Sequence, residues 1–192
     1  MKRIAKRLVS DLSELLRKKG RAILVIDGDC AAGKTTLAAQ IAAQIDCNVF
    51  HMDDFFLPSA LRTEARLAEI GGNIDYERFL AQVLKPMQAN KPFTYGAYSC
   101  KDGTTHYCAV QDKPVAVIEG SYALHPNFLA TYQAMGALKV FLRIDAEEQL
   151  KRIQTRNGDT MLRRFREEWI PMEKRYQQAY RSAWGNVTFI DG

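Results

Sequence analysis

The stretch GDCAAGKTT (residues 28–36) combines glycines, a lysine and threonines at a spacing suited to holding phosphate. Gly28, Gly33, Lys34 and Thr35 fit the pattern G-x-x-x-x-G-K-[ST] without a gap. The glycines let the backbone curl so that consecutive N–H groups face phosphate oxygens, and a helix beginning near Lys34 adds its positive end. We expect Lys34 to reach the β- and γ-phosphates of a nucleoside triphosphate and the Thr35 hydroxyl to ligate Mg²⁺.

The loop is flanked by the elements that such a motif requires. The apolar run AILVI (residues 22–26) precedes it and reads as a strand buried on both faces, and a helix is predicted from Lys34 to about residue 45. This context favours ATP binding over a chance match of the pattern. The predicted ATP-binding residues are Gly28, Asp29, Cys30, Ala31, Ala32, Gly33, Lys34, Thr35 and Thr36.

Acidic residues follow two other predicted strands. Asp53 and Asp54 come after the strand at 48–52, and Glu119 ends the strand at 114–120. Open α/β sheets bind ligands at the carboxyl ends of their strands, so these carboxylates are expected near the γ-phosphate. There, one carboxylate could hold the metal through water and another could take the proton from an attacking hydroxyl. Asp54 is equally well interpreted as a helix cap or a surface acid.

Strands and helices alternate along the chain. This alternation predicts an α/β fold with a mainly parallel sheet of roughly five strands. Together with the phosphate-binding motif after the first strand, it leads us to expect a three-layer P-loop NTPase. Strands are expected at 22–27, 48–52, 114–120, 137–144 and 186–190, and helices at 3–19, 34–45, 59–70, 75–90, 146–156 and 161–183. The segment 93–110 alternates like a hairpin around Asp102-Gly103. Asn157-Gly158 is expected to break one helix, and Pro171 to kink or bound another.

The composition of the chain limits the classes of protein to which it can belong. The chain has 192 residues with 47% hydrophobic residues and a net charge of +5. No apolar run is long enough for a membrane span, and the N-terminus resembles neither a secretory signal nor a transit peptide. No nucleic-acid recognition motif is present, and the four cysteines show no metal-binding spacing, which favours reduced thiols and a cytoplasmic location. We expect neither a membrane nor a nucleic acid as a partner, and the sequence leaves open whether the chain forms homo-oligomers.

Six segments in order along residues 20–185 resemble uridine kinases and their relatives, which include phosphoribulokinase, nicotinamide riboside kinase and P-loop pantothenate kinase. These segments are GDCAAGKTT, HMDDFF, GGNIDYERF, VIEGSYAL, QLKRIQTR and EEWIPMEKRY. The resemblance implies a single kinase domain over residues 1–192. Its parts would be an N-terminal helix (1–20), an acceptor-binding insertion with the hairpin (55–112) and a short lid (152–166).

The resemblance also implies roles for individual residues. Asp53 resembles the base that activates the acceptor hydroxyl, and Asp75 resembles the acid that holds the ribose hydroxyls of the acceptor. Tyr95 looks like the hairpin aromatic that packs on the acceptor, and Glu119 like the carboxylate near the metal and the substrate.

Two arginines resemble the lid residues that stabilise charge on the transferred phosphoryl group. Arg152 and Arg156 stand four residues apart on one helix face, and guanidinium groups suit phosphate. A solvated helix face with a Glu148–Arg152 pair is the alternative interpretation.

The sequence thus favours a kinase that transfers the γ-phosphoryl group of Mg-ATP to a hydroxyl of a nucleoside-like acceptor. Two alternatives stay open: an ATP-binding module with slow ATPase activity that acts on a protein partner, and a kinase for another metabolite such as pantothenate. A pocket enclosed by the hairpin and the NID segment (residues 73–75) beside the γ-phosphate would favour a kinase.

Overall fold

The apolar run ahead of the glycine-rich loop forms the central strand of a five-stranded parallel sheet. A computed structural model describes residues 1–191 of the chain. Its strands are β1 (Ala22–Gly28), β2 (Asn48–His51), β5 (Val115–Glu119), β6 (Leu138–Arg143) and β7 (Thr188–Asp191), in the order β2-β5-β1-β6-β7. All pairings are parallel. The predicted α/β fold with a parallel sheet is confirmed.

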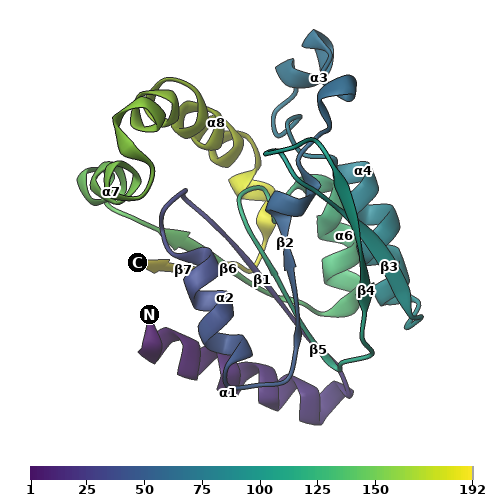
Figure 1. Cartoon of the computed structure of the whole chain (residues 1–192). Helices are drawn as coiled ribbons and strands as arrows, with labels where there is room; N and C mark the ends of the chain where they lie inside the picture. The colour runs from purple at the N-terminus through teal and green to yellow at the C-terminus, as the bar shows by residue number, and fades with distance from the viewer. Residues whose placement is uncertain (192) are drawn as a thin grey trace.

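Helices cover both faces of the sheet, because parallel strands require crossover connections (Figure 1). One face packs on α1 (Lys2–Lys19) and α2 (Lys34–Ala42), and Leu24 and Ile26 of β1 point to that side. Ile23 and Val25 point to the other face. This second face is covered by α6 (Pro126–Met135), by the continuous helical stretch of α4 (Tyr76–Phe79), η3 (Leu80–Leu84) and α5 (Lys85–Gln88), and by the C-terminal helices.

The insertion (residues 55–112) follows η1 (Met52–Phe55) at the end of β2. It carries η2 (Ser59–Leu61), α3 (Glu64–Ala68) and the antiparallel pair β3 (Phe93–Tyr98) and β4 (Thr105–Val110). The predicted hairpin is confirmed. The predicted single helix at 59–70 is wrong in detail: the Thr63 side chain accepts a hydrogen bond from the Arg66 N–H and starts a separate helix there.

The C-terminal helices form the other wall above the sheet (Figure 1). They are α7 (Ala146–Arg164), η4 (Phe165–Trp169), α8 (Ile170–Tyr180) and η5 (Arg181–Trp184). Gly158 interrupts the helical backbone of α7 with a φ of 77° and a ψ of 174°, as Asn157-Gly158 predicts. Pro171 lies in the first turn of α8, directly after the π-helical turn η4, and the backbone stays helical at Trp169. The irregularity near Pro171 is therefore a π-helical turn within a continuous helical stretch. Helix α6 was not expected from the sequence, although its buried residues Phe128 and Tyr132 have the i, i+4 spacing of one helix face.

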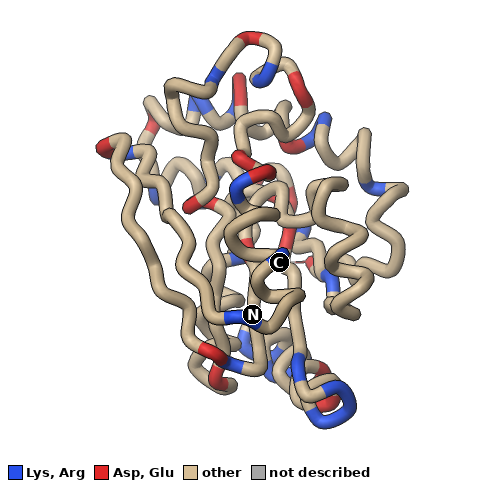
Figure 2. The backbone as a smooth tube through the Cα atoms, turned by 90° about the vertical axis from the view of Figure 1, so that its right-hand side faces the viewer, with Lys and Arg blue, Asp and Glu red and all other residues tan. Residues whose placement is uncertain are grey.

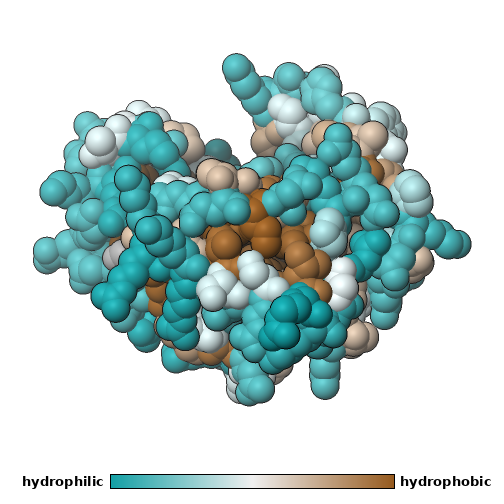
Figure 3. Space-filling model, turned by 90° about the horizontal axis from the view of Figure 1, so that it is seen from below, coloured by the Kyte–Doolittle hydropathy of each residue, from teal (hydrophilic) through white to brown (hydrophobic). Residues whose placement is uncertain are grey.

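The basic N-terminal helix lies at the end of the molecule opposite α3 (Figures 1 and 2). Seen from that end, hydrophilic side chains surround an apolar area (Figure 3). A hollow between the amino ends of the strands and the hairpin has a volume of about 50 Å³, which is too small for a nucleotide. Within residues 1–191, no helix is both long and apolar enough to cross a membrane.

Asp27, at the end of β1, is a buried carboxylate that ties together three parts of the fold. It accepts hydrogen bonds from the Gly28 N–H (2.7 Å), the Leu124 N–H (2.8 Å) and the Tyr176 hydroxyl (2.8 Å). Burial raises the pKa of Asp27 from 3.8 to about 6, although these hydrogen bonds oppose the shift. The folded state therefore binds a proton more readily than the unfolded chain between those two pH values.

This raised pKa predicts a pH-dependent term in stability. The contribution of Asp27 is largest below its unfolded pKa and is lost as the pH rises through about 6. Two pKa units correspond to about 3 kcal/mol. The free energy of unfolding of the natural protein, minus that of Asp27→Asn, should fall by about this amount from pH 4 to pH 7 in urea titrations. Parallel stability curves for the two proteins would contradict the assignment.

Candidate active site

A cavity of about 1100 Å³ lies at the carboxyl ends of the strands, between the insertion and the C-terminal helices. Its volume suits a nucleotide together with a second small molecule. The loop and the C-terminal helices line one side, with Cys30, Ala31, Gly33, Lys34, Thr35, Thr36, Arg152, Arg156, Arg164, Phe165, Glu168, Trp169, Met172 and Glu173. The other lining residues are Asp53, Phe56, Ser59, Arg62, Leu67, Asn73, Tyr98, Cys100, Gly103, Glu119, Gly120, Ser121 and Tyr122.

The glycine-rich loop has the curled backbone that its sequence predicts. A Cβ at Gly28 would stand 2.3 Å from the Leu142 carbonyl oxygen, so only glycine fits beside β6. Gly33 has a φ of 96° and precedes α2, and Ala31 has a φ of 62°. Within residues 1–191, the backbone N–H groups of Ala31, Gly33, Lys34 and Thr35 have no protein acceptor. These donors at a helix N-terminus can bind an anion such as phosphate.

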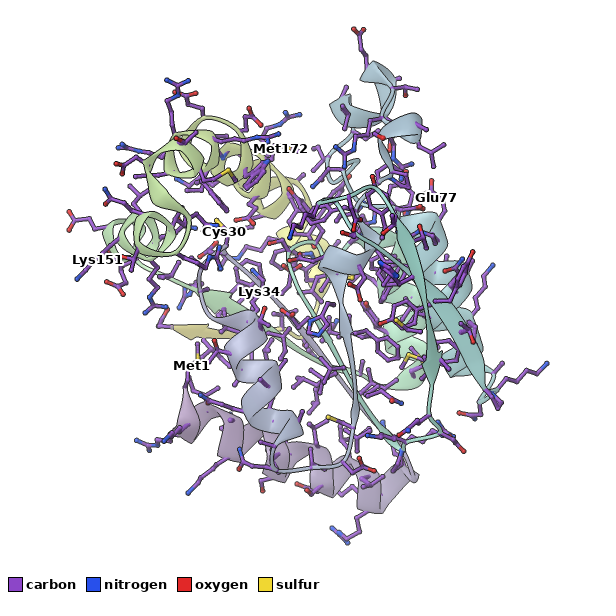
Figure 4. The ribbon with its side chains drawn as sticks, viewed as in Figure 1. Met1, Cys30, Lys34, Glu77, Lys151 and Met172 are labelled. Carbon is purple, nitrogen blue, oxygen red and sulfur yellow. The ribbon has the colours of Figure 1, made fainter. Side chains whose placement is uncertain are left out.

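Lys34 is held inside this loop. Its ammonium group donates hydrogen bonds to the carbonyl oxygens of Gly28 (2.7 Å) and Asp29 (2.9 Å) and to the Ser121 hydroxyl (3.3 Å). Lys34 lies at the start of α2, and Met172 of α8 lies above it (Figure 4). The side chain is therefore already directed to the cavity floor, where phosphate oxygens can replace its present partners.

Glu119 joins the loop to the end of β2. The Thr35 hydroxyl donates to its two carboxylate oxygens at 3.1 and 3.3 Å, and the Nδ1 atom of His51 lies 2.5 Å from Oε1. This hydrogen bond to a carboxylate raises the pKa of His51. Sequence patterns alone do not connect His51 with Glu119, because only the pairing of β2 with β5 places the two residues side by side.

The oxygen atoms of Thr35 and Glu119 suit a magnesium ion. Mg²⁺ usually takes one or two protein oxygens and completes its shell with phosphate oxygens and water. In the described part of the chain no group of three or more His, Cys, Asp or Glu residues could hold a metal alone. The residues present therefore fit a cation that arrives with a nucleotide.

Asp53 opens into the cavity, whereas Asp54 does not. Both lie in the first turn of η1, but only Asp53 is among the lining residues. The enclosing protein and the charge of Glu119 raise the pKa of Asp53, while Lys34 opposes the shift. Asp54 accepts a hydrogen bond from the Tyr95 hydroxyl at 3.2 Å. The two neighbouring acids thus have different surroundings, with Asp53 facing the phosphate loop.

Two residues that were expected to contact the acceptor lie outside the cavity lining. Asp75 caps α4, and its carboxylate accepts hydrogen bonds from the N–H (3.1 Å) and the Nε atom (2.9 Å) of Arg78. Tyr95 is 7% exposed and packs on Phe55. The hairpin aromatic that lines the cavity is Tyr98, which sequence reasoning did not single out.

Arg152 and Arg156 both line the cavity beside the loop. Arg152 pairs with Glu148 at 2.7 Å, as the helical spacing predicts, and also donates to the Ala31 carbonyl oxygen at 3.3 Å. The Nε atom of Arg156 donates to Asn157 at 2.8 Å, and no carboxylate in residues 1–191 forms an ion pair with it. Their role in charge stabilisation stays a prediction.

One polar face of α8 holds the outer side of the loop. Glu173 accepts a hydrogen bond from the Cys30 N–H at 2.9 Å, and Gln177 donates to the Asp29 carboxylate at 2.7 Å. Tyr176, on the same face, donates to Asp27. These three helix residues have the i, i+3, i+4 spacing that places side chains on one face. This spacing within IPMEKRYQQAY is the signal that could have identified them in the sequence.

Glu173 is the central residue of this contact. It is 8% exposed, and besides Cys30 it accepts a hydrogen bond from the Ser121 hydroxyl at 2.7 Å. Ser121 in turn accepts from Lys34. Glu173 is therefore a positioning residue that fixes both the loop and the partner of its lysine.

Replacing Glu173 is expected to weaken both folding and nucleotide binding. Glu173→Ala leaves the Cys30 N–H and the Ser121 hydroxyl without their acceptor, which should cost about 2 kcal/mol of unfolding free energy. Calorimetry with a non-hydrolysable ATP analogue should show reduced affinity. Glu167→Ala, which removes an exposed acid one helix segment away, is the control and should match the natural protein in both measurements. Equal affinity in Glu173→Ala would remove Glu173 from this role.

No protein-family model and no curated protein sequence matches the chain. Solved structures do match it along almost the whole length. A possible uridine kinase from Bacillus stearothermophilus has a TM-score of 0.61 and 20% identity, covering 95% of this chain and 99% of its own. YFH7 from Saccharomyces cerevisiae, a proposed P-loop containing kinase with a circular permutation, has a TM-score of 0.75 and 12% identity, covering 98% and 99%.

A D-glycerate 3-kinase from Cryptococcus neoformans has a TM-score of 0.60 and 12% identity, covering 98% of this chain and 95% of its own. Identities this low establish a shared architecture and leave the acceptor molecule open. The architecture agrees with the sheet order, the curled loop and the cavity above it. The chain therefore has the fold of the P-loop kinases, and its resemblance to uridine kinases and their relatives holds at the level of that fold.

Proposed function

We propose that this protein is a small-molecule kinase that transfers the γ-phosphoryl group of ATP to a hydroxyl group of its acceptor. One observation carries the proposal: a single cavity contains both the phosphate loop and Asp53, with the insertion as its opposite wall. A carboxylate across from a triphosphate site can receive a proton from an alcohol. A regulatory ATPase that contacts a protein partner would not need a walled second compartment of this kind.

The transfer follows from the position of these groups. The acceptor oxygen attacks the γ-phosphorus, the bond from this phosphorus to the β–γ bridging oxygen breaks, and ADP leaves. The proton of the acceptor hydroxyl passes to the Asp53 carboxylate, whose raised pKa favours its uptake. Catalysis in such reactions comes mainly from positioning and from neutralising charge.

Cations of the chain would neutralise the negative charge of the phosphates. Lys34 reaches the phosphate end from the loop, and Arg152 and Arg156 line the cavity from α7. Thr35 and Glu119 would hold a magnesium ion, which when bound supplies further neutralisation of the phosphate oxygens. The α7 arginines then act as the lid that the sequence resemblance implies.

The acceptor class proposed first is a nucleoside-like alcohol, because the sequence segments resemble uridine kinases. The cavity side opposite the loop offers Phe56 and Tyr98 as aromatic surfaces that suit a flat ring. A non-nucleoside alcohol is the second candidate. The D-glycerate 3-kinase that shares the fold gives it support.

Asp53→Asn should remove most of the turnover. An asparagine cannot accept the proton, and loss of a general base typically lowers kcat by about 10²- to 10⁴-fold. ADP release with ATP, Mg²⁺ and a panel of nucleosides and small polyols measures this effect. Asp54→Asn changes the adjacent acid, which lies outside the cavity, and should keep kcat within a few-fold. A kcat retained in Asp53→Asn would exclude Asp53 as the base.

Lys34→Ala should reduce nucleotide affinity without unfolding the protein. The substitution removes the ammonium group from the phosphate loop, and charge-assisted hydrogen bonds contribute about 1.5–3 kcal/mol each. Calorimetric titration with a non-hydrolysable ATP analogue should therefore show at least about a tenfold weaker Kd. Lys151→Ala, an exposed cation of α7 that points away from the cavity (Figure 4), serves as the charge-matched control. Unchanged affinity in Lys34→Ala would place the nucleotide elsewhere.

A further inference from the structure

Three arginines in the first half of the insertion have different surroundings. Arg66 donates to the backbone oxygens of Gly72 and Ile74 and forms an ion pair with Glu77 at 2.7 Å. Arg78 pairs with Asp75 at 2.9 Å and donates to backbone oxygens on either side. Their side chains are 15% and 16% exposed. Both arginines are structural, because their guanidinium groups are used in holding the insertion together.

The Arg62 side chain is held by a hydrogen bond to the backbone but forms no ion pair with an acid of the described residues. Its Nε atom donates to the Leu57 carbonyl oxygen at 2.7 Å, and its Nη2 atom lies 3.9 Å from the Cys100 sulfur, a weak acceptor. No carboxylate of residues 1–191 lies within 4.0 Å of its guanidinium nitrogens. Arg62 lines the cavity, so it directs an oriented and unneutralised charge into it.

The backbone connects Arg62 with the proposed base. Asp53 and Arg62 stand at the two ends of one short segment. This segment is attached to residues 73–75 by two backbone hydrogen bonds, Leu57 N–H to Asn73 (2.9 Å) and Asp75 N–H to Phe55 (2.7 Å). The cation and the base therefore belong to one segment of the cavity lining, and this segment is tied to the rest of the insertion at Phe55 and Leu57.

The other cavity cations serve the opposite end. Lys34, Arg152, Arg156 and Arg164 belong to the loop and to α7, where the phosphates of the nucleotide bind in the proposed function. Of these, Arg164 forms an ion pair with Glu168 at 3.0 Å.

Arg62 belongs to the insertion, where its N–H donates to the Ser59 carbonyl oxygen and its guanidinium group lies near Cys100 of the hairpin. In the proposed function the acceptor would lie on this side. A guanidinium group binds carboxylate or phosphate through two parallel hydrogen bonds, which a neutral alcohol cannot match.

We infer that the acceptor carries an anionic group, a carboxylate or a phosphate, that binds Arg62 while its hydroxyl group faces Asp53. The inference rests on the proposed kinase function and narrows its substrate class. A neutral nucleoside would leave the Arg62 charge without a partner inside the occupied cavity, and this is unfavourable once water is displaced.

Matched pairs of alcohols test the inference. The pairs are glycerol and D-glycerate, uridine and orotidine, and ribose and ribose 5-phosphate, so that carboxylate and phosphate are examined separately. Kinase assays with Mg-ATP measure kcat and KM for each compound. Calorimetry measures the binding of the three anionic compounds to protein saturated with Mg²⁺ and a non-hydrolysable ATP analogue.

The variants separate charge from structure. Arg62→Ala removes the group, Arg62→Lys keeps the charge without the planar fork, and Arg62→Gln keeps a donor for the Leu57 carbonyl oxygen. Lys101→Ala removes an exposed cation at the tip of the hairpin, outside the cavity, and controls for general attraction of anions. The Gln and Lys variants decide the question if the Ala variant does not fold.

The expected result is that an anionic member of a pair is the better substrate. Its KM should rise about 10- to 100-fold in Arg62→Ala and Arg62→Gln, the loss typical of a charge-assisted pair, and less in Arg62→Lys. The affinity for the ATP analogue should not change, and Lys101→Ala should behave like the natural protein.

Three results would overturn the inference. The first is that neutral acceptors are the better substrates and their kcat and KM do not change in the Arg62 variants. The second is that the anionic compounds bind the Arg62 variants as tightly as the natural protein, and the third is that these variants lose affinity for the ATP analogue and not for the acceptor. The first of these leaves the kinase function intact. Conversely, Arg62-dependent anion binding without any phosphoryl transfer would support the anion site and contradict the proposed function.

Discussion

The contact between one polar face of α8 and the phosphate loop is the constraint on which the rest of the site depends. Glu173, Tyr176 and Gln177 bond to the backbone or the carboxylates at the end of β1, so a helix distant in sequence holds the curl from outside. With its outer groups used in this way, the loop presents its remaining N–H donors and Lys34 to the cavity. A small cluster of apolar side chains around Cys30, Ile153 and Phe165 strengthens the same contact.

This contact also links nucleotide binding to the wall of the cavity. Helix α7 continues into α8 through η4, so the segment that carries Arg152 and Arg156 is continuous with the helix that holds the loop. Gly158 provides a break in α7 between these arginines and the rest of the wall. A phosphate group that contacts both the loop and these arginines would therefore be bound by one continuous part of the structure.

The charges in the cavity are arranged in sequence from the loop to the insertion. Cations of the loop and of α7 stand at one end, the Asp53 and Glu119 carboxylates lie between, and Arg62 stands at the other end. Charges placed in this order favour a nucleotide whose phosphates meet the cations at one end and an acceptor whose anionic group meets Arg62 at the other, with the reacting hydroxyl between them. The basic residues of the N-terminal helix are not among the residues that line this cavity, although Met1, just ahead of that helix, lies against Gly33 of the loop.

The sequence alone determined the parallel sheet, the curled loop and the position of the strand-end acids, because these follow from local patterns: an apolar run, a glycine spacing and the place where a strand stops. It could not determine which polar residues meet across the fold. The hydrogen bond between His51 and Glu119 depends on strand pairing, and the contact of Glu173 with Cys30 joins segments 143 residues apart. Likewise, of the three arginines in the first half of the insertion, two are structural residues and one is a cavity cation. Only tertiary structure could decide this, since the partners of a charged side chain are set by packing between distant segments.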